Sequence, residues 1–329
     1  MRGHSWPTPL PAGSATGIGS VPGTDVRSAQ RRIFDLLPDF PHLVELPDRG
    51  PGADLIGRGA ALLADLPVDL QPAGWRLVDR PGRDLRRAVD LLDRDVDALA
   101  EAADGWSGPL KLQATGPWTL AAGLELPRGD KALSDPGAVR DLADSLAEGL
   151  ALHVARVADL VPGAALAVQL DEPSLPATLA GRLPTASGFS VLRRPEPAEV
   201  QELLAVVLSR LPNAGVHCCA RRVPVGLLRA AGARWLSVDL AMLDPIREDD
   251  ALGEALEAGI GLIAGTGPDG EAAAELSRRL GVAPATWLDG VVLAPPCGLA
   301  GMPEGQAWTA LKGVRDAARR LAEQIGEGA

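Results

Sequence analysis

Short apolar runs bounded by glycine or proline recur along the chain. Each run has the length of a short strand, and an uninterrupted apolar run is typical of a strand that is buried on both faces. These runs predict buried strands at 110–114, 165–170, 235–238, 261–264 and 291–294.

Longer stretches with the apolar spacing of an amphipathic helix lie between these runs. They predict helices at 85–103, 138–160, 197–211, 223–231, 271–280 and 306–325. A chain in which strands alternate with helices forms a parallel sheet with right-handed helical crossovers. About eight such units in this length favour a (β/α)8 TIM barrel over an open doubly wound sheet. Because the sequence shows no convincing internal repeat or low-complexity linker, we expect a single α/β domain over residues 1–329.

Two stretches rich in proline and glycine, 46–52 and 174–197, follow predicted strands. In a barrel, the loops that follow the strands build the active-site face. We therefore expect these two loops to border the functional site.

Composition and charge narrow the class of protein. Hydrophobic residues make up 46% of the 329 residues and charged residues 23%, which is typical of a packed globular protein and not of a disordered or rod-like one. The 32 Lys and Arg against 43 Asp and Glu give a net charge of −11, which repels a phosphate backbone. Nucleic acid is therefore not an expected partner.

The sequence also bears on the compartment. No stretch reaches the ~18 to 20 uninterrupted apolar residues of a membrane span, and residues 1–7 lack the apolar segment of a signal peptide. We therefore expect a cytoplasmic protein with no membrane partner. Three cysteines argue against a secreted disulfide framework and leave metal binding or thiol chemistry. The chain has no tyrosine, which excludes mechanisms that need a phenol.

The segment Val216-His217-Cys218-Cys219 places an imidazole and two thiols at the end of an expected short strand. Side chains at positions i and i+2 of a strand lie on the same side, so His217 and Cys219 can turn towards one point. Two other interpretations stay open on this pattern alone. The residues could simply fill a buried strand end, or Cys218 and Cys219 could form a redox disulfide.

Two further potential ligands, Asp239 and Cys297, follow later expected strands. Strand ends that are far apart in sequence meet on one face of a barrel. One nitrogen, two sulfurs and a carboxylate oxygen suit Zn²⁺, whereas Mg²⁺ and Ca²⁺ prefer oxygen alone. Because the spacing differs from the paired cysteines of a zinc finger, a catalytic zinc site is the better hypothesis. Its expected ligands are His217, Cys219, Asp239 and Cys297.

Five short segments lie at expected strand ends, at 17–22, 115–117, 169–173, 217–219 and 296–299. In order they read Gly-Ile-Gly-Ser-Val-Pro, Thr-Gly-Pro, Gln-Leu-Asp-Glu-Pro, His-Cys-Cys and Pro-Cys-Gly-Leu. Together they resemble the cobalamin-independent methionine synthases, and in particular the C-terminal catalytic barrel of that family. The resemblance covers nearly the whole chain.

The resemblance implies that the first and third segments hold the amino acid substrate, homocysteine. An acidic segment early in the family's barrel is only loosely represented here, by one glutamate. Each element also has a structural alternative, because the first segment is typical of a tight strand exit and the acids of the third could cap the next helix. The substrate-binding residues that the resemblance implies are Ile18, Gly19, Ser20, Glu45, Asp171 and Glu172.

The resemblance further implies that Zn²⁺ is bound by His217, Cys219 and Cys297. The family has a glutamate as another zinc ligand, and Asp239 stands in its place with a shorter arm, which would bind more weakly or through water. Zinc favours the thiolate form of a bound thiol, and only the thiolate attacks a methyl group efficiently. The implied reaction is methyl transfer to the thiol of homocysteine, which forms methionine.

Family members that use methyl-tetrahydrofolate directly carry a second, N-terminal barrel, for which this chain has no room. An aromatic platform for a pterin ring would have to come from tryptophans such as Trp118 or Trp235, which are equally typical of core packing. We therefore expect a methyl-corrinoid as the donor, presented by a partner protein, in preference to methyl-tetrahydrofolate.

Three other functions stay open. One is zinc-dependent alkyl transfer to or from another thiol, such as coenzyme M. A related barrel family decarboxylates porphyrinogens, but its anionic substrate needs an arginine-lined cleft that a zinc set does not explain. The third is a non-catalytic regulator that binds zinc or thiols.

Overall fold

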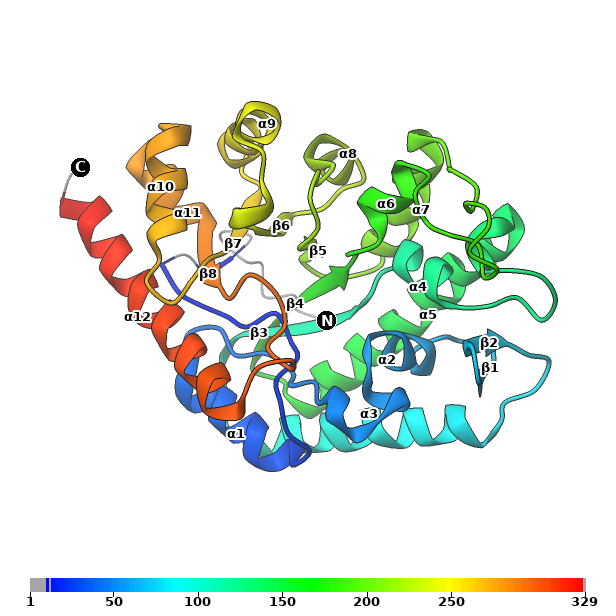
Figure 1. Cartoon of the computed structure of the whole chain (residues 1–329). Coiled ribbons are helices and arrows are strands. Elements are labelled where there is room, and N and C mark those ends of the chain that lie inside the picture. Colours follow the sequence, from blue (N-terminus) through cyan, green and yellow to red (C-terminus); the bar gives the residue numbers. More distant parts are fainter. Residues whose placement is uncertain (1–9, 12, 328–329) are drawn as a thin grey trace.

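A six-stranded parallel sheet forms the centre of the computed structural model, which describes residues 10, 11 and 13–327. The strands follow one another in sequence order, and the sheet curls so that the helices lie on its outer side (Figure 1). All five predicted apolar runs are strands, and a sixth strand ends at Cys218. The strands are β3 (Gly108–Thr115), β4 (Ala164–Asp171), β5 (Ala214–Cys218), β6 (Trp235–Asp239), β7 (Gly261–Gly265) and β8 (Val291–Ala294).

The six predicted helices are all present, five of them with one or both ends shifted and the one at 271–280 with the predicted ends. They correspond to α3 (Arg83–Ala102), α5 (Pro136–Leu160), α7 (Pro197–Leu208), α8 (Val225–Ala230), α10 (Glu271–Leu280) and α12 (Glu304–Glu327). Aspartate side chains that cap free backbone N–H groups define several helix starts, as Asp135 does for α5. The remaining helices are α1 (Val26–Leu36), α2 (Leu55–Ala61), α4 (Pro117–Gly123), α6 (Leu175–Leu179), α9 (Pro245–Glu257) and α11 (Pro284–Gly290).

The prediction of eight regular strands was correct for only six. Residues 14–20 and 42–45 form no strand ladder, although single parallel bridges connect Ala15 with Leu293, Ser20 with Glu45 and His42 with Lys111. These two segments lie between β8 and β3, where Thr16 N donates to Leu293 O at 2.9 Å. Glycine weakens a strand, and Gly17 and Gly19 lie in the first segment. The two segments also approach each other closely, since a Cβ on Gly17 would lie 2.4 Å from His42 Cε1.

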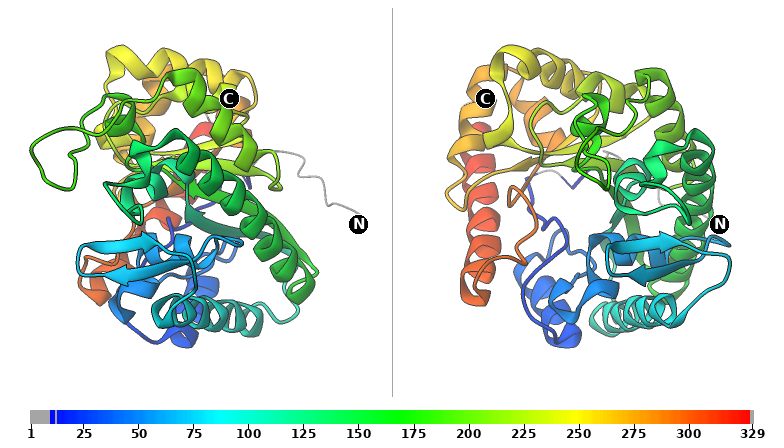
Figure 2. Two further views of the ribbon diagram at one scale, coloured as in Figure 1. Left: turned by 90° about the vertical axis from the view of Figure 1, so that its right-hand side faces the viewer. Right: turned by 45° about the vertical axis from the view of Figure 1, so that its right-hand side comes forward.

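Two connections carry structure that the sequence pattern did not predict. A two-stranded antiparallel hairpin, β1 (Val68–Gln71) and β2 (Gly74–Leu77), lies between α2 and α3. It projects from the same side of the molecule as the connection between α6 and α7 (Figure 2, left). Two short 3-10 helices form in the predicted loop 46–52, Pro47–Arg49 and Pro51–Ala53, the second of which extends one residue beyond it. Residues 1–7, considered above for a signal peptide, lie outside the described residues.

The interior of the curled sheet changes character along the strands, and β4 illustrates this. Ala167 belongs to a small buried apolar cluster that is separate from the main core. Two residues further on, the buried Gln169 accepts a hydrogen bond from Lys111, and Asp171 then lines a pocket at the strand end. Alternate residues of a strand point to the same face, so this face changes from apolar to polar towards the carboxyl ends of the strands.

Candidate functional site

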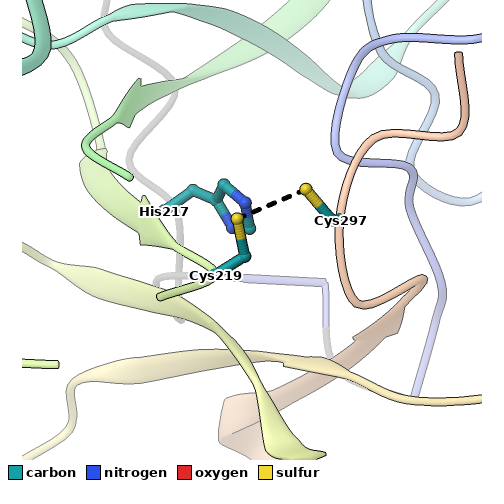
Figure 3. A group of neighbouring side chains, drawn as sticks. All are labelled: His217, Cys219 and Cys297. Carbon is teal, nitrogen blue, oxygen red and sulfur yellow. Dashed lines mark hydrogen bonds between the residues drawn. The ribbon is translucent and has the colours of Figure 1, made fainter. Parts of the chain in front are cut away.

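A histidine and two thiols meet at the carboxyl ends of the strands. His217 lies near the end of β5 with Cys219 just beyond it, and Cys297 lies in the loop after β8. The side chains of His217 and Cys219 turn towards Cys297, which approaches from the facing loop (Figure 3). One potential ligand atom from each residue lies within 4.8 Å of the other two. This set could hold a metal ion.

The imidazole of His217 has the arrangement of a metal ligand. Its Nδ1 lies 2.9 Å from the Oγ of Ser237, which is paired with His217 across β5 and β6. Its buried Nε2 has no hydrogen-bond partner among the described residues. Histidines that bind metals usually hold one ring nitrogen by such a second contact and leave the other for the ion. Sequence reasoning missed Ser237, although it lies two residues before Asp239 and so on the same face of its strand.

The two thiols of the set share a contact. Cys297 Sγ and Cys219 Sγ are 3.3 Å apart (Figure 3). The neighbouring Cys219 thiol and the His217 imidazole lower the pKa of Cys297 to about 4, while the contact with Cys297 raises the pKa of Cys219. One of the two sulfurs is therefore readily available as a thiolate, the form in which cysteine binds metals.

Cys218 differs from its two neighbours in the set. All three cysteines are free, so the chain has no disulfide between Cys218 and Cys219. The Cys218 side chain is fully buried in the main core, and burial raises the pKa of its thiol. The alternation of side chains along β5 thus separates a core residue from two site residues.

Asp239 lies at the end of β6, but its carboxylate is outside the group of mutually close ligand atoms. Its Oδ1 instead accepts a hydrogen bond from Ala241 N at 2.9 Å and caps the short helix that follows. Burial raises the pKa of Asp239, and the neighbouring Cys297 contributes to the rise. The carboxylate is therefore near the site without being part of its closest set.

A pocket of about 240 Å³ opens beside the histidine and the thiols. It is smaller than the ~300–1,000 Å³ typical of sites for drug-sized ligands, which suits a small substrate. Five of the six residues expected to bind the substrate line it together with three expected metal ligands. These eight residues are Ile18, Gly19, Ser20, Glu45, Asp171, His217, Cys219 and Cys297.

The neighbours Asp171 and Glu172 face different surroundings. Asp171 lines the pocket, and burial raises the pKa of its carboxyl to about 7. Glu172 is absent from the described pocket lining, and its carboxylate accepts from Trp118 N at 2.9 Å and Thr119 N at 2.8 Å. It therefore caps α4, a helix that precedes it in sequence, instead of the next helix considered above. This assigns Glu172 a structural contact and leaves Asp171 at the pocket.

The Cys297 loop packs directly against the Ile18–Ser20 segment. Leu299 N donates to Ser20 O at 2.8 Å, and a Cβ on Gly298 would lie only 2.1 Å from Ser20 Oγ. A side chain at this position would displace the Ser20 hydroxyl group from its present place. The contact brings one thiol of the set next to a segment that was expected to hold an amino acid.

Sequence reasoning also missed a buried polar group behind the pocket, formed by Lys111, Gln113 and Gln169. Their signal was a polar residue at alternate positions of otherwise apolar runs. Trp118 and Trp235 are fully buried, and their indole N–H groups donate to the backbone oxygens of Val200 and Asn213. These two tryptophans are core residues and provide no platform in the pocket.

The curled parallel sheet, with a histidine and two thiols at its strand ends, defines an α/β protein that has a possible metal site beside a small pocket. The family model for the catalytic domain of the cobalamin-independent synthases matches residues 13–320. The chain therefore belongs to this family, which confirms the resemblance found in the sequence.

A solved structure of a methionine synthase shares the fold. A B12-independent methionine synthase from Shewanella sp. W3-18-1, solved in complex with selenomethionine, superimposes with a TM-score of 0.62 at 11% identity. The match covers 96% of this chain and 99% of that one. An endo-β-1,4-mannanase from Cellulomonas fimi reaches a TM-score of 0.46 at 14% identity, over 93% of this chain and 71% of its own. No curated protein matches the chain. Among the described residues, no helix has the length and apolar character needed to cross a membrane.

Proposed function

We propose that this protein is a zinc-dependent methyltransferase that transfers a methyl group to the thiol of homocysteine and forms methionine. The observation that carries the proposal is one small pocket that joins the His217, Cys219 and Cys297 set to the Ile18–Ser20 segment and Asp171. Membership of the cobalamin-independent synthase family supports it.

The donor set fits zinc. Two thiols and an imidazole with an unpartnered buried Nε2 are soft and borderline ligands, which Zn²⁺ prefers and Mg²⁺ or Ca²⁺ does not. His217, Cys219 and Cys297 would hold the ion, with Asp239 as a weaker or exchangeable fourth ligand. When bound, zinc favours the thiolate of a substrate thiol, whose unperturbed pKa is about 8.5.

The other side of the pocket suits the head group of an amino acid. Asp171 and Glu45 line the pocket, and their carboxylates would attract the substrate ammonium group. Gly19 and Ser20 line it with backbone and hydroxyl groups that could bind the substrate carboxylate. A head held here fixes the direction of the thiol and lowers the entropic barrier to reaction.

The same charges bear on the alternatives. Coenzyme M is a thiol that carries a sulfonate and no ammonium group, so it has no group for the carboxylates of Asp171 and Glu45 to bind. A thiol with an ammonium group is the better match. We therefore favour homocysteine as the methyl acceptor.

For the methyl donor we favour a methyl-corrinoid presented by a partner protein. The described pocket lining contains no tryptophan or phenylalanine, and Trp118 and Trp235 are buried in the core. A pterin ring would therefore find no aromatic stacking surface in the described pocket. A methyl-corrinoid supplies a reactive methyl group and does not need a pterin-stacking surface in the pocket.

The test is methionine formation by the zinc-loaded protein from homocysteine with either methylcobalamin or methyl-tetrahydrofolate, including its polyglutamate form. We expect turnover with the corrinoid. Turnover with the folate alone would reverse the choice of donor and leave the methyl acceptor unchanged. No methionine with any donor, together with no binding of homocysteine in calorimetry, would refute the proposed function.

A further inference from the structure

A lysine is buried inside the curled sheet, behind the pocket. Lys111 lies on β3, its side chain is fully buried, and it is not among the residues that line the pocket. Its Nζ lies 2.9 Å from Ile18 O, 3.0 Å from Gln169 Oε1 and 3.3 Å from Gln113 Oε1. Three acceptors match the three N–H groups of an ammonium ion.

Each of these acceptors belongs to, or leads to, a different wall of the pocket. The carbonyl of Ile18 belongs to the Ile18–Ser20 segment itself. Gln169 Nε2 donates to Asp171 Oδ1 at 2.7 Å and to Ile18 O at 2.9 Å. Gln113 Nε2 donates to Glu45 Oε1 at 3.2 Å and also to Leu43 O. One cation therefore connects three segments that are far apart in the sequence.

The two glutamine amides act as directional links. Because the ammonium group attracts the carbonyl end of each amide, the NH2 end must face the carboxylate beyond it. Without the cation, either amide could rotate and present its carbonyl oxygen to Asp171 or Glu45, which would repel it. The carboxylates would then lose both their donors and their fixed directions.

The charge of Lys111 is itself stabilised by this arrangement. Burial lowers the pKa of Lys111 to about 8, while Asp171 and Glu45 oppose that shift. The positive charge thus has two negative partners at the far ends of the amides, as a buried charge requires.

We infer that Lys111 is a positioning residue for amino acid recognition: through Ile18, Gln113 and Gln169 it aligns the three pocket walls that would hold the substrate head group. This inference rests on the proposed function of the pocket. Lys111 makes no hydrogen bond to His217, Cys219 or Cys297. Loss of the lysine should therefore affect recognition of the head group and leave metal binding unchanged.

The experiment compares two thiols in the zinc-loaded protein. Homocysteine carries the amino acid head, and propane-1-thiol has only the chain and the sulfur. We expect Lys111→Met to weaken homocysteine binding about 10- to 100-fold in calorimetry, the effect of losing one charge-assisted hydrogen bond or more. Propane-1-thiol binding and zinc content should stay within about twofold of the wild type, because neither depends on the head-group contacts.

Lys131→Met is the matched control. Lys131 also pairs with a carboxylate, that of Glu125 at 3.5 Å, but lies outside the described pocket lining. This control should bind both thiols as the wild type does. A Lys111→Met protein that loses affinity for both thiols to the same extent would show a general structural role and overturn the inference.

A second pair of variants covers the case in which Lys111→Met does not fold. Gln169→Met cuts the link to Asp171, and Gln113→Met cuts the link to Glu45. Each should weaken homocysteine and spare propane-1-thiol. If the wild type binds homocysteine and both variants bind it equally well, the inference is overturned. If the wild type itself binds no homocysteine, the proposed function is overturned, and this inference with it.

Discussion

The two sides of the pocket are built in different ways. The metal side, consisting of His217, Cys219 and Cys297, takes two of its residues from the end of one regular strand, β5, which pairs with β6. The third, Cys297, lies three residues beyond the end of β8. The head-group side takes Ile18–Ser20 and Glu45 from segments that carry only single bridges. Only Asp171 on that side ends a regular strand.

Side-chain contacts replace the missing ladder on the head-group side. Lys111 and its two glutamines hold this side from within the sheet. A second group of charges also contacts Glu45, whose Oε1 lies 3.3 Å from Arg58 Nε. Arg58 also pairs with Asp95. The two carboxylate oxygens of Asp95 accept from Arg49 Nη1 at 2.7 Å and Nη2 at 2.8 Å. The metal side should therefore be sensitive to its own ligands, and the head-group side to buried residues that do not touch the substrate.

The largest expected effect is on the metal side. Replacing Cys219 or Cys297 with serine removes a thiolate ligand, so zinc affinity should fall about 100-fold or more and methionine formation should cease. Cys218→Ser should have a mild effect on zinc, because its side chain lies in the core. Zinc content measured by atomic absorption checks this. Loss of the metal from the Cys218 variant alone would show that the ligands are wrongly assigned.

The second prediction addresses the buried charges behind the head-group side. Asp95 is fully buried between two arginines, so Asp95→Asn leaves them without their negative partner and should cost about 3–5 kcal/mol of unfolding free energy. Asp93, on the same helix, pairs with Arg156 at the surface, and Asp93→Asn should cost less than about 1 kcal/mol. Denaturant unfolding of both variants measures the contrast. Equal losses of unfolding free energy in the two variants would show that the buried Asp95 pairs stabilise the fold no more than the surface Asp93 pair does.

The sequence could predict most of the fold and the metal side for one physical reason. Parallel strands that are covered on both faces appear as apolar runs, and their carboxyl ends meet at one edge. Segments 14–20 and 42–45 have no such run. Tertiary contacts, such as the close approach of Gly17 and His42, determine their shape, and a sequence pattern does not show these contacts. Their site residues were found only through resemblance to a family.

Some residues could not be predicted because their partners are distant in sequence. The polar residue within an apolar run marks Lys111 as unusual but does not show its role, which depends on Ile18 and Gln169. The β1–β2 hairpin also lacked a signal, since its strands are short and only partly buried. For Glu172, a short motif cannot tell a carboxylate at a pocket from one that caps a helix, and the partners that it accepts from lie more than fifty residues earlier in the chain.

The third prediction tests the charge on the head-group side. Because burial raises the pKa of Asp171 to about 7, the carboxyl is protonated below that pH and ionised above it. Only the ionised form attracts an ammonium group, so affinity for an amino acid head should decrease as the pH falls through about 7. Methionine is the test ligand, since it has the same head and no thiol proton, and calorimetry between about pH 6 and 8 measures its binding.

Asp171→Asn should bind methionine about 10- to 100-fold more weakly at the upper end of this range and should lose the decrease near pH 7. Glu172→Gln is the control, because the pKa of Glu172 is also raised to about 7 but its carboxylate caps α4. That variant should keep the decrease. A decrease that persists in Asp171→Asn would assign it to another group.

The smallest expected effect concerns Asp239. It ends a regular strand, β6, yet its carboxylate is outside the closest ligand set. Asp239→Asn keeps an oxygen that can accept from Ala241 N and removes only the charge. If the carboxylate is a weak or water-mediated ligand, zinc affinity should fall by about tenfold, well below the effect of losing a thiolate. Asp239→Glu restores the longer arm of the family's glutamate and should bind zinc at least as tightly as the wild type. Competition with a chromophoric chelator ranks the zinc affinities of the three proteins. If Asp239→Asn binds zinc as weakly as Cys297→Ser does, Asp239 is a full ligand, and the end of β6 must move to bring its carboxylate to the metal.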